Sequence, residues 1–211
     1  MDDLTARFFP YLEVIRANWG WMGWNTVLAL IPLGLAVGLF RRNVRQSILW
    51  WLGFALFFAF LPNAPYVLTD VVHLFESAQT GYSPWVVALV MGPMYGVFLL
   101  IGFAAYVGSV LSMGRYVDQQ GGGRWVTGIE LGTHGLCAIA IYWGRFWRFN
   151  SWDLVTRPQV LLAQIWQHLF DPQQAATISL IFAGLALAYW AGKRGALALV
   201  NKQESVNKQE S

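Results

Sequence analysis

The sequence predicts an all-α fold, namely a polytopic membrane helix bundle of about five transmembrane helices with interfacial amphipathic helices beside them. Only 12% of its 211 residues are charged and the mean hydropathy is +0.45, whereas soluble domains carry about 25% charge. Its charge-free stretches are long enough to cross the hydrocarbon layer, which takes roughly 20 helical residues. They are continuously apolar and lack the alternation typical of a membrane β-barrel.

Five spans follow from the distribution of charge along the chain. Four stretches contain no Asp, Glu, Lys or Arg, and a fifth is interrupted only by Glu130. The predicted spans are residues 23–40, 47–61, 84–110, 125–145 and 174–192. They form the central part of a three-part organisation: residues 1–22 are an interfacial amphipathic segment, 23–195 the helix bundle, and 196–211 a disordered tail that repeats VNKQES.

The orientation in the membrane is predicted from the basic residues, because Lys and Arg near spans stay on the cytoplasmic side. Five spans with the amino terminus outside place nine basic residues inside and five outside. The nine are Arg41, Arg42, Arg45, Arg115, Arg124, Lys193, Arg194, Lys202 and Lys208, and the five are Arg7, Arg16, Arg145, Arg148 and Arg157. The loops 62–83 and 146–173 are then outside and the carboxyl tail is cytoplasmic.

The first polar motif is LPNAPYVLTDVVHL, residues 61–74, where Pro62 and Pro65 are expected to end the second span. Beyond them a short helix would place Asp70, His73 and Glu76 on one face, since they recur every three residues. An Asp and a His at this spacing can bind a metal ion or share a proton. Alternatively, the three side chains cap and solvate an interfacial helix.

The second polar motif is YWGRFWRFNSWDL, residues 142–154, at the outer end of the fourth span. Arg145 and Arg148 share a helical face and can bind a phosphate or carboxylate, or pair with Asp70, Glu76 and Asp153. Alternatively, they snorkel among interfacial aromatic residues. We predict that the two motifs meet, with Arg145 or Arg148 hydrogen-bonded to Asp70 or Glu76, and with His73 and Asp153 in the same pocket.

These two motifs, together with WNTVLALIPLGL at residues 24–35, resemble the bacterial membrane-protein family catalogued as domain of unknown function 1361. The resemblance covers about residues 24–158 and implies a protein of the bacterial plasma (inner) membrane, without implying a reaction. The matching residues are Asn63, Pro65, Tyr66, Asp70, His73, Arg145, Arg148, Asn150, Trp152 and Asp153.

A second candidate pair lies inside the fourth span, where Glu130 and His134 are four residues apart and so share a helical face. An acid and an imidazole within a span are a candidate functional site. The alternative is a structural hydrogen bond to Ser109, Ser112 or Tyr95 of the third span.

Residues 154–170 are predicted to form a helix that lies on the outer surface as a lid. Leu154, Leu161, Ile165 and Leu169 recur at helical spacing, but Pro158 and several polar residues argue against a span. Asp171 and Pro172 are expected to start the last span.

Two classes of function remain open. In the first, the outer polar cluster binds or processes a lipid head group, a cell-envelope precursor or a metal ion, with Asp70 and His73 as the candidate metal ligands. In the second, the protein is a non-enzymatic assembly partner or small carrier, and the cluster is a structural ion-pair network. The expected partners are the lipid bilayer and an anionic or lipid-linked ligand. The net charge of +3 reflects the positive-inside rule and does not indicate nucleic-acid binding, and the sequence identifies no cofactor.

Overall fold

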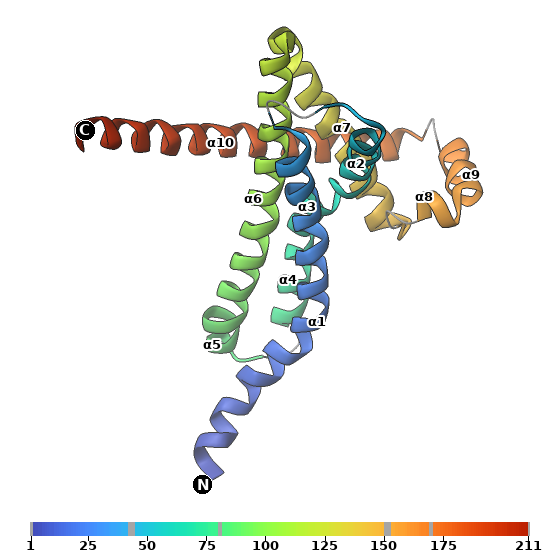
Figure 1. Cartoon of the computed structure of the whole chain (residues 1–211). Helices are drawn as coiled ribbons and strands as arrows, with labels where there is room; N and C mark the ends of the chain where they lie inside the picture. Colours follow the sequence, from blue (N-terminus) through green and yellow to red (C-terminus); the bar gives the residue numbers. More distant parts are fainter. Residues whose placement is uncertain (1, 42–44, 80–81, 150–152, 169–170, 211) are drawn as a thin grey trace. The chain divides into compact units, whose positions relative to one another are not determined.

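The chain folds into helices that are long enough to cross a membrane (Figure 1). The computed structural model describes residues 2–41, 45–79, 82–149, 153–168 and 171–210, and every regular element within these ranges is helical. The stretches among them that are apolar and long enough to span a membrane are Glu13–Leu39, Ile48–Glu76, Pro84–Phe146 and Pro172–Val200. The predicted all-α membrane fold is therefore confirmed.

The third of these stretches accommodates two of the predicted spans. It is 63 residues long, and a straight helix of that length would measure about 95 Å, three times the hydrocarbon thickness. The chain instead reverses at Gly121, whose φ of 83° lies in the left-handed region. Figure 1 shows this reversal between α6 and α7. It falls between the predicted spans 84–110 and 125–145.

The helices group into two compact units, which are described separately. The first consists of Met1–Leu39 and Gln46–Tyr106, and the second of Phe40–Arg45 and Val107–Ser211. The first unit contains α1 (Asp2–Leu39), α2 (Ile48–Phe60), α3 (Asn63–Tyr66), the 3₁₀ turn η1 (Val67–Asp70), α4 (Val71–Gln79), α5 (Pro84–Val86), the π turn η2 (Val87–Met91) and the part of α6 (Gly92–Val117) that ends at Tyr106.

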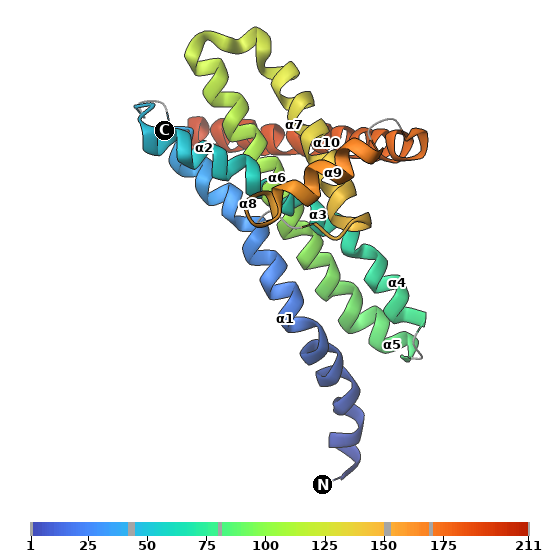
Figure 2. The same ribbon diagram turned by 90° about the vertical axis from the view of Figure 1, so that its right-hand side faces the viewer.

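In the first unit, α1 packs against α2 and α3 and also contacts η1 and η2, and Figure 2 shows α2 beside the carboxyl-terminal end of α1. The indole Nε1 of Trp50 donates a hydrogen bond of 3.0 Å to the carbonyl of Leu39, which ties the start of α2 to the end of α1. The side chain of Ser47 caps α2 by accepting from the N–H of Trp50. These contacts join two helices that the sequence separates only by a short basic loop.

The two prolines of the first motif redirect the helix without ending the helical conformation. As predicted, α2 ends before them, at Phe60. Pro62 then occupies the N-cap of α3 with a φ of −61°, and Pro65 falls within the first turn of α3. A missing N–H is harmless in a first turn, because no carbonyl is available there to accept it. The chain therefore continues through η1 into α4, which brings Asp70 to the end of a 3₁₀ turn.

Gly102 of α6 lets this segment approach α6 closely. A Cβ on Gly102 would lie 2.8 Å from the Cβ of Val67 and 2.9 Å from the carbonyl oxygen of Ala64. Ala64, Val67 and Asp70 are all buried. The glycine thus fixes the position of the backbone that carries Asp70.

Replacing Gly102 with alanine is expected to destabilise the protein by about 1–3 kcal/mol, because the methyl group overpacks a contact with backbone. Thermal unfolding in detergent would measure the change. Gly96→Ala is the matched control, since a Cβ on Gly96 of the same helix meets no described atom within 4 Å. Equal stability of the two variants would contradict the close contact at Gly102.

The second unit contains the rest of α6 and the helices that follow it. These are the π turn η3 (Asp118–Gly122), the 3₁₀ turn η4 (Gly123–Trp125), α7 (Val126–Phe146), α8 (Asp153–Thr156), α9 (Pro158–His168) and α10 (Pro172–Glu210). The main packing of this unit is between α7 and α10. The predicted start of the last span is present, since α10 begins at Pro172 and the Asp171 carboxylate accepts from the N–H of Gln173 at 2.9 Å.

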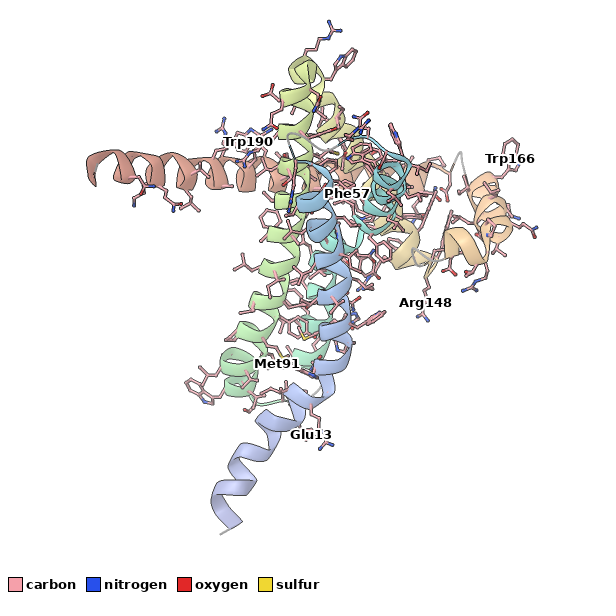
Figure 3. The ribbon with its side chains drawn as sticks, in the orientation of Figure 1. Glu13, Phe57, Met91, Arg148, Trp166 and Trp190 are labelled. Atoms are coloured by element: carbon pink, nitrogen blue, oxygen red, sulfur yellow. The ribbon has the colours of Figure 1, made fainter. Side chains whose placement is uncertain are left out.

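The helix predicted over 154–170 is found as α8 and α9, and Pro158 takes the first position of α9. The described stretches that could span a membrane do not include α8 or α9, in agreement with the prediction. Trp166 of α9 is 81% exposed and projects away from the helix (Figure 3). The location of α9 on the outer surface stays a prediction.

The stretch Ile48–Glu76 extends beyond the predicted span 47–61, and the predicted boundaries at both ends of the chain also differ from the structure. Residues 2–22 are continuous with the first span in the single helix α1, so no break separates an interfacial segment from it. At the other end, α10 continues through the repeated VNKQES sequence to Glu210, where a disordered tail was predicted. The tail lacks Pro and Gly after Gly195 and is rich in good helix formers. Extending an existing helix also avoids the cost of nucleation.

Candidate functional site

The first unit holds a cluster of Asp70, His73 and Glu76, named here the His73 cluster, on the face that their spacing predicted. The Nδ1 atom of His73 lies 3.0 Å from Oε2 of Glu76, and its Nε2 atom lies 3.8 Å from Oδ1 of Asp70. The first distance is a hydrogen bond and the second is within ion-pair range. The imidazole thus lies between two carboxylates.

The cluster runs from the interior of the unit to its surface. The Asp70 side chain is 4% exposed, that of His73 42% and that of Glu76 65%. Asp70 is buried because Gly102 lets η1 pack closely against α6. The helix α4 carries the other two residues outward. The exposed His73 ring therefore has a buried carboxylate on one side and an exposed one on the other.

A polar network from α1 and α6 also contacts His73 through Trp21. Trp21 of α1 meets the His73 ring edge-on, with 5.6 Å between the ring centroids. The Trp21 Nε1 donates to Oδ1 of Asn18 at 3.1 Å, and the Tyr95 hydroxyl of α6 donates to the same oxygen at 3.3 Å. The sequence analysis did not predict this support. The available signal was Asn18 itself, an amide at the edge of a charge-free stretch.

The hydrogen bond to Glu76 assigns a chemical role to each nitrogen of His73. A carboxylate accepts, so the contact with Glu76 favours the tautomer that carries its proton on Nδ1, in which the Nε2 lone pair can accept a proton. When Nε2 takes a proton, the nearby Asp70 carboxylate stabilises the resulting imidazolium. Within the described residues, no three His, Cys, Asp or Glu side chains form a group suited to hold a metal ion. The contacts of His73 are those of a group able to transfer a proton, and metal binding at Asp70 and His73 stays a prediction.

The arginine motif follows α7 in the second unit. Arg145 lies in the last turn of α7, and Arg148 just beyond it has a φ of 56°, the only positive φ among the described residues that are not glycine. The N–H groups of Trp147 and Phe149 both bond to the carbonyl of Trp143, which closes the helix end. Figure 3 shows the exposed Arg148 side chain projecting away from the ribbon. Asn150 and Trp152 of the motif lie outside the described residues.

Arg148→Gly is expected to raise the free energy of unfolding by about 0.5–1 kcal/mol, because glycine adopts the left-handed conformation without a Cβ clash. Thermal unfolding in detergent would measure it. If Arg148 serves as a binding residue, the same variant combines higher stability with lost function. A less stable variant would instead assign the Arg148 side chain a structural contact.

Asp153 has a partner that the sequence analysis missed. Its Oδ1 accepts from Nη2 of Arg157 at 2.9 Å and from Nε at 3.0 Å. Asp153 is 1% exposed, and the Thr156 hydroxyl also approaches it. The two residues are four apart, a spacing that pairs side chains on a helix. Asp153 therefore stabilises the α8–α9 turn.

The predicted contact between the two motifs joins residues of different units. Asp70, His73 and Glu76 belong to the first unit, and Arg145, Arg148 and Asp153 to the second. The meeting of the two motifs stays a prediction.

Glu130 and His134 occupy one face of α7, as predicted, and both are buried. The hydrogen bonds to Glu130 come from α10 and not from the third span. The Tyr189 hydroxyl donates to Oε1 at 2.6 Å, and the Lys193 ammonium donates to Oε1 and Oε2 at 2.6 and 2.8 Å. The His134 ring packs on that of Tyr189, with 4.7 Å between centroids. Lys193, which had been counted only as a cytoplasmic charge, is thus the ion-pair partner of Glu130.

Long apolar helices that bury a few paired carboxylates define this chain as an all-α integral membrane protein. It belongs to the family described as Protein of unknown function (DUF1361), whose model matches residues 24–189. The match confirms the resemblance and extends it beyond residue 158, so that it includes Tyr189. No curated protein and no solved structure matches the chain.

Proposed function

We propose that the His73 cluster is an extracytoplasmic acid–base site that processes the head group of a lipid or of a lipid-linked cell-envelope precursor. In this proposal the protein resides in the bacterial plasma membrane, with its amino terminus outside and its carboxyl terminus in the cytoplasm. The asymmetry of basic residues supports that orientation.

The observation that carries the proposal is the position of His73 between a buried and an exposed carboxylate. Glu76 at 3.0 Å orients the ring through Nδ1, and Asp70 at 3.8 Å lies beside the basic Nε2. His73 then accepts a proton from a hydroxyl group or a water molecule, which activates that oxygen as a nucleophile. Lipid head groups and their precursors carry such hydroxyl groups next to phosphates.

The structural alternative has less support at this cluster than elsewhere in the chain. A purely structural network is expected to bury and pair all of its charges, as Asp153 and Glu130 are buried and paired. By contrast, the side chains of His73 and Glu76 are 42% and 65% exposed. An exposed ion pair contributes at most about 1 kcal/mol to the stability of the folded protein. A stabilising role therefore explains this arrangement poorly.

The test is a head-group turnover assay with the purified full-length chain. The protein is reconstituted into vesicles of phosphatidylethanolamine and phosphatidylglycerol that contain a polyprenyl phosphate, and mass spectrometry follows the head groups. We expect turnover with the parent chain and its loss in His73→Gln, with unchanged thermal unfolding. Turnover that survives in His73→Gln would reject the acid–base role, and a variant that loses only stability would support the structural alternative.

A further inference from the structure

A cavity of about 300 Å³ lies between α7 and α10 in the second unit, and it has no part in the proposed acid–base site. This volume is at the lower end of the range for small-ligand sites. The polar and aromatic residues that line it are Glu130, His134, Tyr189, Trp190, Lys193 and Arg194. Its apolar lining includes Leu131, Ala186 and Leu197.

The acidic group of the cavity is already neutralised. Glu130 accepts three hydrogen bonds of 2.6, 2.6 and 2.8 Å from Tyr189 and Lys193. One ammonium group offsets one carboxylate, so this pair contributes no net charge. A cationic ligand would have to displace Lys193 from Glu130, which argues against cations as the ligand.

Arg194 supplies the excess positive charge. Its guanidinium carbon lies 3.8 Å from the centroid of the Trp190 ring, a stacked arrangement that fixes the plane of the group. No carboxylate of the described residues lies within ion-pair distance of Arg194. The in-plane N–H groups of a stacked guanidinium point outward and match the oxygens of a phosphate. The cavity is therefore suited to an anion.

The position of the cavity along α10 favours a lipid as the source of that anion. Residues 172–192 contain no charged side chain, and Lys193 and Arg194 are the first charges after them. This is where a spanning helix leaves the hydrocarbon and enters the head-group layer. Trp190 is 53% exposed and Leu131 is 44% exposed, so apolar surface adjoins the charged groups. Basic pockets between spanning helices at this depth bind anionic head groups.

We propose that this cavity binds the phosphate group of an anionic phospholipid, with Arg194 contacting the phosphate oxygens. Trp190 and Leu131 then contact the glycerol and the start of the acyl chain. Lys193 remains paired with Glu130 and adds donors at the inner end of the cavity.

Native mass spectrometry of the full-length chain in detergent tests the proposal, with phosphatidylglycerol titrated against phosphatidylcholine. The parent chain is expected to prefer phosphatidylglycerol, and Arg194→Gln to weaken its binding about fivefold, the usual effect of one basic residue near the membrane surface. Arg124→Gln is the matched control, because Arg124 also stacks on a tryptophan, 5.3 Å from the Trp125 centroid, but does not line the cavity.

Three results would overturn the proposal. Equal binding of the two lipids would exclude a preference for an anionic lipid. Equal losses of binding in Arg194→Gln and Arg124→Gln would show that only the total positive charge of the protein matters. The third is competition by inorganic phosphate at millimolar concentration, which would assign the site to a soluble phosphate. Selective loss in Arg194→Gln that inorganic phosphate does not reproduce would support the lipid site.

Discussion

Replacing Lys193 with methionine is expected to lower the free energy of unfolding by about 3 kcal/mol. Removing one partner of a buried ion pair leaves an uncompensated charge and costs about 3–5 kcal/mol. Here the remaining charge is Glu130, whose side chain is 8% exposed. The lower end of the range applies because the Lys193 side chain is 30% exposed. Equilibrium unfolding in mixed detergent micelles would measure the change.

Two further variants separate the ion pair from other effects of the substitution. Arg194→Met removes a neighbouring charge from the same helix but leaves Glu130 paired, so its effect should stay below about 1 kcal/mol. In Lys193→Met the additional change Glu130→Gln removes the uncompensated charge and should restore most of the lost stability. If Lys193→Met and Arg194→Met were equally stable, the Glu130–Lys193 pair would not hold α7 and α10 together.

The helices could be predicted because their signals are local. Charge-free stretches of about twenty residues define the spans, and Asp171 with Pro172 marks the start of α10 by the usual N-terminal chemistry. The common face of Asp70, His73 and Glu76 follows from helical spacing alone. Each of these predictions depends only on residues within a few positions of one another.

The partners of the site residues could not be predicted, because they come from distant parts of the sequence. Lys193 is 63 residues from Glu130, and Tyr95 is 77 residues from Asn18. Spacing defines the faces of one helix but not the helix that covers each face. The Asp153–Arg157 pair is different, since its separation of four residues was visible in the sequence. It was missed because the predicted helix began at residue 154, and Asp153 just before it was considered only as a partner of Arg145 and Arg148.

The tail shows the limit of composition as a guide. Its polar repeat has no apolar face and so predicted disorder. Because α10 is already formed when it reaches Val200, the repeat only has to extend a helix. Extension adds a hydrogen bond with each residue, and residues such as Lys, Gln and Glu have high helix propensity.

The second large effect is expected at Asp70, where Asp70→Asn should lower head-group turnover by about 10²–10⁴-fold, the usual contribution of acid–base catalysis. Asparagine keeps the shape of the side chain but removes the charge 3.8 Å from Nε2 of His73. The ring then loses the carboxylate that stabilises its protonated form. Turnover in the vesicle assay described above would measure the effect, with thermal unfolding recorded in parallel.

Glu13→Gln is the matched control for Asp70→Asn, because it makes the same carboxylate-to-amide change at an exposed position of the first unit (Figure 3). It should leave turnover and stability unchanged. Glu76→Gln should have a smaller effect than Asp70→Asn, since an amide oxygen can still accept from Nδ1 and solvent screens a side chain that is 65% exposed. If Asp70→Asn lowered stability by several kcal/mol and left turnover intact, Asp70 would be a structural residue. The acid–base proposal would then lose the buried carboxylate on which it depends.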